Sequence, residues 1–173
     1  MNTQALAQKI KLIIFDVDGV LTDGGLYFTN DGTEFKRFNS LDGHGIKMLK
    51  DTGVEPAVIS ARESNAVKHR MENLGIVHFY QGQSDKVVAF NDLLQQLNLS
   101  AAEVAYVGDD VIDLPVMNKV GFAIAVANAH DLVKQHADLT TEKSGGNGAV
   151  REICDFILKA QGNFDGAIKV YLD

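Results

Sequence analysis

The sequence contains no tryptophan, one cysteine and two prolines among its 173 residues. A single cysteine, Cys154, excludes a disulfide within the chain, and its apolar neighbours Val150, Ile153 and Ile157 indicate a buried position on a helix. No apolar stretch reaches the roughly 18 residues that a membrane span requires. The first eleven residues also lack the apolar core of a signal peptide. We therefore expect a cytoplasmic protein without a membrane-spanning segment.

Positive charge is also scarce, with 16 Lys and Arg against 23 Asp and Glu, for a formal net charge of −7. An acidic balance argues against general binding to nucleic acid or to anionic membranes. It does not exclude a phosphate ester, because a few local cations can outweigh the overall field. With 46% hydrophobic residues, the chain is suited to a single domain spanning 1–173 with a substantial core.

The most informative stretch is an apolar run, 12–15, that ends in two carboxylates. Asp16 and Asp18 are two residues apart, so on a strand their side chains lie on the same side. Two such charges resist joint ionisation unless a positive group lies between them. Gly19 then allows the backbone to turn and to approach a ligand closely. This combination predicts a functional site, because it would not stabilise a sheet.

Short apolar runs alternate with helical patterns along the rest of the chain. The predicted strands are 12–15, 57–59, 77–80, 104–107 and 122–126, and the predicted helices are 44–51, 64–74, 85–97, 131–136 and 149–161. Such alternation predicts an α/β fold, a Rossmann-like parallel sheet with helices on both faces. Aromatic arms around Asn30, Asp31 and Gly32 predict a small β-hairpin flap over about 26–38. The C-terminal tail, 163–173, lacks helical periodicity.

Chemically capable side chains follow several of these strands. Asp16 and Asp18 come after the first, Ser60 after the second and Asp109 after a later one, while Lys86 begins a helix. Ligands of parallel sheets bind at the carboxyl ends of the strands, so these groups are expected to meet. Carboxylates without thiolates or imidazoles favour Mg²⁺. Together they could position a phosphoryl group for transfer.

The segments 16–22 (DVDGVLT) and 108–113 (GDDVID), with Ser60 and Lys86 between them, resemble the four ordered motifs of the haloacid dehalogenase superfamily. The resemblance implies a phosphatase in which Asp16 is the nucleophile and Asp18 the acid and base. It also implies that Ser60 and Lys86 hold the phosphoryl oxygens. Asp16, Asp109 and the backbone carbonyl of Asp18 would bind the metal.

Two features of the motif region are less specific. Asp110 and Asp113 could support the metal ligands or cap a helix, since aspartate suits both positions. The segments on either side of Ser60 are too short for the cap domain that many members of the superfamily carry. We therefore expect no cap domain, and the hairpin is the candidate cover for the site.

Four further segments resemble those superfamily members that hydrolyse 3-deoxy-D-manno-octulosonate 8-phosphate, an eight-carbon acidic sugar phosphate made for lipopolysaccharide: 38–46 (FNSLDGHGI), 80–86 (YQGQSDK), 106–110 (YVGDD) and 145–152 (GGNGAVRE). This resemblance implies a homotetramer in which hairpins and tails close neighbouring sites. The implied substrate contacts are Asp18, Asn39, Ser40, Leu41, Asp42, Gly43, Lys47, Arg62, Arg70 and Lys86.

Other interpretations differ in substrate or in class. A phosphatase for another acidic sugar phosphate, such as a nonulosonate 9-phosphate, would use the same site. A sugar-phosphate mutase is disfavoured by the missing cap, because nothing retains an intermediate for a second transfer. A phospho-accepting receiver module also clusters aspartates with a lysine, but Asp18 favours rapid hydrolysis of the phosphorylated state. A non-catalytic assembly subunit is the weakest alternative, since every chemical group is present.

Overall fold

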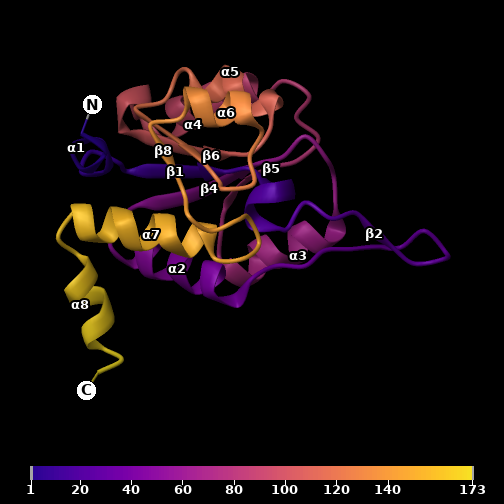
Figure 1. The fold of residues 1–173 in the computed structure, drawn as a ribbon, viewed down its shortest axis with the longest axis horizontal. Coiled ribbons are helices and arrows are strands. Elements are labelled where there is room, and N and C mark those ends of the chain that lie inside the picture. The colour runs from indigo at the N-terminus through magenta and orange to yellow at the C-terminus, as the bar shows by residue number, and fades with distance from the viewer. Residues whose placement is uncertain (1, 173) are drawn as a thin grey trace.

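A six-stranded parallel sheet forms the centre of the computed structural model, which describes residues 2–172 (Figure 1). Its strands lie in the order β5 (His78–Tyr80), β4 (Glu55–Ile59), β1 (Leu12–Phe15), β6 (Val104–Gly108), β7 (Phe122–Ala125) and β8 (Leu139–Thr140). Each neighbouring pair is parallel. The predicted Rossmann-like sheet is therefore confirmed, with the short edge strand β8 added to it.

Helices cover both faces of the sheet. In Figure 1, α2 (Ser40–Asp51) and α7 (Ala149–Ala160) lie below the sheet and contact each other extensively. The other face carries α4 (Lys86–Leu97), α5 (Leu114–Met117) and α6 (Asp131–His136). Helix α3 (Asn65–Leu74) contacts α2 and ends at Gly75, which adopts the left-handed conformation common at helix ends.

Strand β1 lies between β4 and β6, and all four of its side chains are fully buried. Both faces of this strand are covered by helices, which explains why its sequence is continuously apolar rather than alternating. Along the chain, the next strands of this sheet, β4 and β5, lie on one side of β1. The later strands, β6 to β8, lie on its other side. The carboxyl end of β1 is therefore the point where the strand order reverses, a position at which ligands of such sheets bind.

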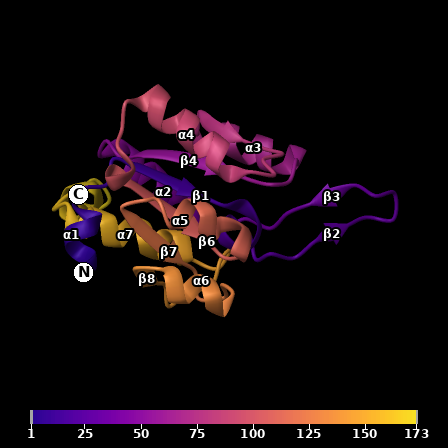
Figure 2. The ribbon, with the colours of Figure 1, turned by 90° about the horizontal axis from the view of Figure 1, so that it is seen from above.

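The predicted hairpin is present, formed by β2 (Tyr27–Phe28) and β3 (Glu34–Phe35). It extends away from the sheet at the end where β1 terminates (Figure 2). The rings of Tyr27 and Phe35 form a stacked cross-strand pair, 5.3 Å apart. Gly32 has φ of +85°, which the turn between the two strands requires.

The C-terminal segment differs from its prediction. Residues Phe164–Lys169 form a helix, α8, so the prediction of a tail without helical structure is wrong. The segment is short and packs against α7, where Lys159 Nζ lies 4.7 Å from the centre of the Phe164 ring. This tertiary contact, rather than amphipathic periodicity, supports the helix. Together with α1 (Thr3–Ala7), α8 lies at the end of the molecule opposite the hairpin (Figure 2).

Two further absences concern the described residues, 2–172. None of their helices is both long and apolar enough to cross a membrane. No cap domain interrupts the sheet, because α2 alone joins β4 to the hairpin, and α3 alone joins β4 to β5.

Candidate active site

The site begins where β1 ends. Asp16 continues the sheet by one residue, since its N–H donates to the carbonyl of Val107 at 3.0 Å. The chain then turns through Asp18 and through Gly19, whose φ is +88°. A Cβ atom on Gly19 would lie 2.0 Å from Oδ2 of Asp109. Gly19 thus provides both the turn and the space for a second carboxylate beside Asp16.

Three carboxylates converge here, and oxygen atoms of Asp16, Asp109 and Asp113 lie within 4.8 Å of one another. Asp109 Oδ1 is buried and has no hydrogen-bond partner within residues 2–172. Both oxygens of Asp113 are already used, because Oδ1 binds Lys86 and Oδ2 accepts backbone N–H groups. Asp109 Oδ1 together with the carboxylate of Asp16 fits a hard cation such as Mg²⁺. Mg²⁺ is the cofactor that this donor set selects, in agreement with the sequence.

Burial and mutual repulsion make Asp16 and Asp109 difficult to ionise. Burial, followed by the charge of Asp113, raises the pKa of Asp16 to about 6, although Lys86 partly opposes the shift. Burial and then the charges of Asp16 and Asp113 raise the pKa of Asp109 to about 7. A cation between Asp16 and Asp109 would relieve both effects.

Lys86 lies within this cluster, and only 2% of its side chain is exposed. Its Nζ is 2.8 Å from Asp16 Oδ1 and 2.7 Å from Asp113 Oδ1. Burial opposes the charge of the ammonium group, but the two carboxylates outweigh burial and raise the pKa of Lys86. The buried hydroxyl of Tyr106 also donates to Asp113 Oδ1, at 2.7 Å. Lys86 is therefore held as a permanent positive charge beside Asp16.

Asp110 and Asp113 were each expected either to support the metal ligands or to cap a helix, and their roles in the structure differ. Asp110 caps the short helix that follows it, because Oδ1 accepts the N–H of Val111 at 2.7 Å. Asp113 has both roles: Oδ2 accepts the N–H groups of Asp109 and Asp110, while Oδ1 orients Lys86. It thereby fixes the backbone that carries Asp109.

Ser60 and Arg62 follow β4 and face the same opening. The N–H of Arg62 donates to Ser60 Oγ at 3.3 Å. A cavity of about 220 Å³ is lined by these residues together with Asp16, Asp18, Gly24, Ala61, Asp109, Asp110 and Ile112. The structure thus brings together the predicted nucleophile, acid, metal ligands and phosphoryl-binding groups.

Two site residues were not predicted from the sequence. Lys36 Nζ lies 2.5 Å from Asp18 Oδ1, and Glu34 Oε1 accepts from the Nη2 of Arg62 at 2.8 Å. Both come from the hairpin, and they are two residues apart, so they project from the same side of its second arm. That spacing, in a hairpin already expected to cover the site, is the signal that could have identified them.

The other predicted substrate contacts lie apart from this cavity. Ser40, Gly43, Lys47 and Arg70 line a second cavity of about 180 Å³ with His44, Asn73 and Leu74. The Nη2 of Arg70 donates to the backbone carbonyl of Asn39 at 3.2 Å. The Asn39 side chain caps α2 by accepting the N–H of Leu41 at 2.8 Å. Within one chain, these residues do not join the carboxylate site.

Asp42 has a structural contact. Its side chain is buried, and Oδ1 accepts the N–H of Arg151 at 2.8 Å, in the first turn of α7. The glycine loop 144–148 packs on the catalytic turn. A Cβ atom on Gly145 would lie 1.7 Å from the carbonyl oxygen of Gly19, and the N–H of Gly146 donates to Val20. The loop therefore supports the turn that carries Asp18.

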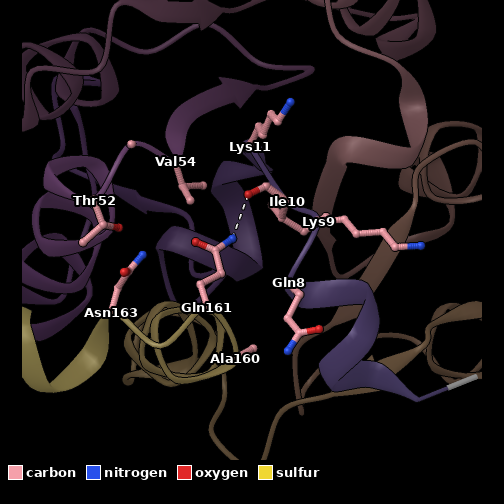
Figure 3. A pocket seen from close by; sticks show the side chains of 10 residues that line it. Gln8, Lys9, Ile10, Lys11, Thr52, Val54, Ala160, Gln161 and Asn163 are labelled. Atoms are coloured by element: carbon pink, nitrogen blue, oxygen red, sulfur yellow. Dashed lines mark hydrogen bonds between the residues drawn. The ribbon is translucent and has the colours of Figure 1, made fainter.

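A larger cavity, of about 560 Å³, lies at the opposite end of the sheet (Figure 3). Its lining includes Lys9, Lys11, Thr52 and Asn163. The Gln161 side chain donates to the carbonyls of Ala7 and Ile10 there, which ties the end of α7 to the segment between α1 and β1. Among the described residues, no carboxylate lines this cavity, so its size does not make it the reactive site.

Carboxylates, a buried lysine and a hydroxyl at the switch point of a parallel sheet define a metal-dependent enzyme of phosphoryl transfer. Residues 75–153 match the family model of the haloacid dehalogenase-like hydrolases. Over 161 residues the chain is 53% identical to the 3-deoxy-D-manno-octulosonate 8-phosphate phosphatase of Salmonella typhi, covering 93% of this chain and 86% of that protein.

Solved structures agree with this result. A 3-deoxy-D-manno-octulosonate 8-phosphate phosphatase from Yersinia pestis superimposes with a TM-score of 0.94 at 48% identity, covering 95% of this chain and 89% of the other. The enzyme from Moraxella catarrhalis, in complex with magnesium, phosphate and the octulosonate, superimposes with a TM-score of 0.95 at 43% identity. The match covers 98% of this chain and 97% of that enzyme. The chain belongs to the haloacid dehalogenase-like phosphatases, in the 3-deoxy-D-manno-octulosonate 8-phosphate phosphatase family.

Proposed function

We propose that this protein hydrolyses 3-deoxy-D-manno-octulosonate 8-phosphate to the free sugar acid and phosphate, a step in the synthesis of lipopolysaccharide precursors. The observation that carries the proposal is the close grouping of Asp16, Lys86 and the unpaired Asp109 Oδ1, in a chain 53% identical to a phosphatase with this activity. Polar side chains that could contact a phosphate, among them Ser60 and Arg62, line the cavity beside them.

The reaction proceeds in two steps. A carboxylate oxygen of Asp16 attacks phosphorus, and Asp18 protonates the departing sugar oxygen. Asp18 then removes a proton from water, which attacks the aspartyl phosphate and releases Asp16. Lys86 and the Ser60 hydroxyl hold the phosphoryl oxygens. Bound Mg²⁺, held by Asp16, Asp109 and the backbone carbonyl of Asp18, supplies positive charge at those oxygens.

Substrate recognition would use both cavities in an assembled homotetramer. Arg62 is close to the carboxylate site, whereas Lys47 and Arg70 line the other cavity of the same chain. An eight-carbon sugar acid carries a carboxylate as well as a phosphate, and arginine can bind either group bidentately. A neighbouring subunit that presents Asn39–Gly43, Lys47 and Arg70 would complete the site.

The hairpin and the tail are the elements that would close the site between subunits. The hairpin exposes Phe28 and Phe35, and the tail exposes Val170, Tyr171 and Leu172. Apolar side chains grouped at the ends of projecting segments are typical of association surfaces.

Phosphate release across a panel of eight- and nine-carbon sugar-acid phosphates, with and without Mg²⁺, tests the substrate. We expect turnover only with Mg²⁺ and a higher kcat/KM for the eight-carbon ester; preference for a nonulosonate 9-phosphate would replace the proposed substrate. Asp16→Asn tests the mechanism, and we expect loss of turnover with an unchanged circular dichroism spectrum. If this variant released phosphate at the wild-type rate, the aspartyl-phosphate route would be excluded.

A further inference from the structure

The hairpin carries two opposite charges into the site. Glu34 and Lys36 project from the same side of its second arm, whereas Phe35 between them stacks on Tyr27 on the other side. Only 1% of the Lys36 side chain is exposed, although the hairpin itself extends into solvent (Figure 2). Burying a lysine is costly unless it is paired, so its partners indicate what this side chain does.

Those partners form a ring of alternating charge. Lys36 Nζ lies 2.5 Å from Asp18 Oδ1 and 3.4 Å from Glu34 Oε1. Glu34 Oε1 binds the Nη2 of Arg62 at 2.8 Å, and Nε of Arg62 lies 3.8 Å from Asp18 Oδ2. The catalytic turn and the end of β4 are thereby connected through the hairpin.

We propose that Lys36 is a positioning residue for Asp18. By occupying Oδ1, it fixes the rotation of the carboxyl group and leaves Oδ2 toward Arg62, with which Asp18 lines the cavity. This proposal rests on the function proposed above, in which Asp18 moves the proton. The hairpin then acts within its own subunit, in addition to any contact with a neighbour.

Lys36 neither donates nor accepts a proton in the reaction. In the first step the bond from Asp16 to phosphorus forms, the bond from phosphorus to the sugar oxygen breaks, and that oxygen takes the proton of Asp18. In the second step water gives a proton to Asp18, bonds to phosphorus and displaces Asp16. A fixed Oδ2 serves both transfers, because the proton leaves and returns at the same atom.

The leaving group provides the test. The sugar alkoxide needs a proton to depart, whereas p-nitrophenolate departs without one, and kcat/KM reports only steps through formation of the aspartyl phosphate. General acid catalysis contributes on the order of 100-fold or more. We expect Lys36→Met to lower kcat/KM for the sugar phosphate by roughly 10- to 100-fold, because a small misplacement can cost that much. With p-nitrophenyl phosphate, kcat/KM should change little.

Two variants serve as comparisons. Asp18→Asn should show the same leaving-group dependence more strongly. Arg37→Met removes the neighbouring cation, which binds Asp23 and Asn147 at the base of the hairpin, and should leave the ratio of the two kcat/KM values at its wild-type level.

Equal losses on both substrates, or no loss, for Lys36→Met would overturn the positioning role. The positioning role would also be overturned if Arg37→Met lowered kcat/KM for the sugar phosphate but not for p-nitrophenyl phosphate. That result would show that the effect comes from the integrity of the hairpin. Wild-type protein inactive on both substrates would instead contradict the proposed function, so the two failures are distinguishable.

Discussion

Lys86 lies between two carboxylates, with Nζ 2.8 Å from Asp16 Oδ1 and 2.7 Å from Asp113 Oδ1. Only Asp16 of this pair lines the reactive cavity, while Asp113 is fully buried behind the lysine. Asp113 thus neutralises a buried charge and aims it at the nucleophile. Asp113 also accepts the N–H groups of Asp109 and Asp110, so the positions of both the metal site and Lys86 depend on this one side chain.

The first prediction concerns Asp113→Asn. Removing one partner of a buried ion pair costs about 3–5 kcal/mol, so we expect the free energy of unfolding in urea to fall by about 3 kcal/mol and kcat to drop. Asp92→Asn is the matched control, because Asp92 also accepts from a tyrosine hydroxyl, that of Tyr80, but on the surface. An equal loss of stability in the control would contradict the role of burial.

The metal-free protein should lose stability as pH rises. Asp109 has an ordinary pKa of 3.8 and a folded pKa of about 7. The folded state therefore binds more protons than the unfolded state between these values, so the free energy of unfolding decreases across that range. Calorimetry at pH 5 to 8 without Mg²⁺ should show a falling melting temperature. Asp109→Asn should flatten the slope, and Mg²⁺ should restore stability at pH 8 in the wild type only.

Gly19→Ala should destroy the metal site. Its φ of +88° costs an L residue about 1–2 kcal/mol, and its Cβ would displace Asp109. Gly53→Ala provides the matched control, since Gly53 has φ of +94° and no atom within 4 Å of the added Cβ. Both variants should lose stability, but only Gly19→Ala should lose Mg²⁺ affinity in isothermal titration calorimetry. Unchanged affinity would show that Asp109 does not need the space beside Gly19.

Arg70→Met tests the second cavity. Arg70 binds the Asn39 carbonyl and lies over the Phe38 ring, 5.8 Å from its centre. If a neighbouring subunit presents it to the substrate carboxylate, KM should rise roughly 10-fold or more, as expected for a lost charge-assisted contact, with kcat almost unchanged. Lys68→Met, on the same helix, should leave KM at the wild-type value. A kcat effect without a KM effect would contradict substrate binding.

The tail prediction uses its exposed side chains. Val170, Tyr171 and Leu172 follow α8 and are exposed, so replacing all three with serine should leave α8 and its packing on α7 in place. If the tail closes a neighbouring site, KM should rise or kcat should fall while the subunit number measured by light scattering is retained. Kinetics identical to wild type at all substrate concentrations would contradict that role.

Local sequence patterns determined a large part of this protein. The continuous apolar run of β1 predicted a strand buried on both faces, and Asp16, Asp18 and Asp109 were identifiable because parallel strands end at one edge. Secondary structure and chemistry at strand ends depend on near neighbours in the chain, so the sequence alone could predict them. It could not predict α8, which packing on α7 supports.

The tertiary structure decided which predicted residues meet. Asp42 contacts α7 rather than the cavity, and Arg70 lies apart from Arg62. Lys36 reaches Asp18 because the second arm of the hairpin returns beside the turn, where Phe38 pairs with Thr22. Such contacts join residues far apart in the chain, through geometry that no local pattern encodes. The sequence by itself determined the chemistry at the end of β1, whereas folding decided which side chains orient it.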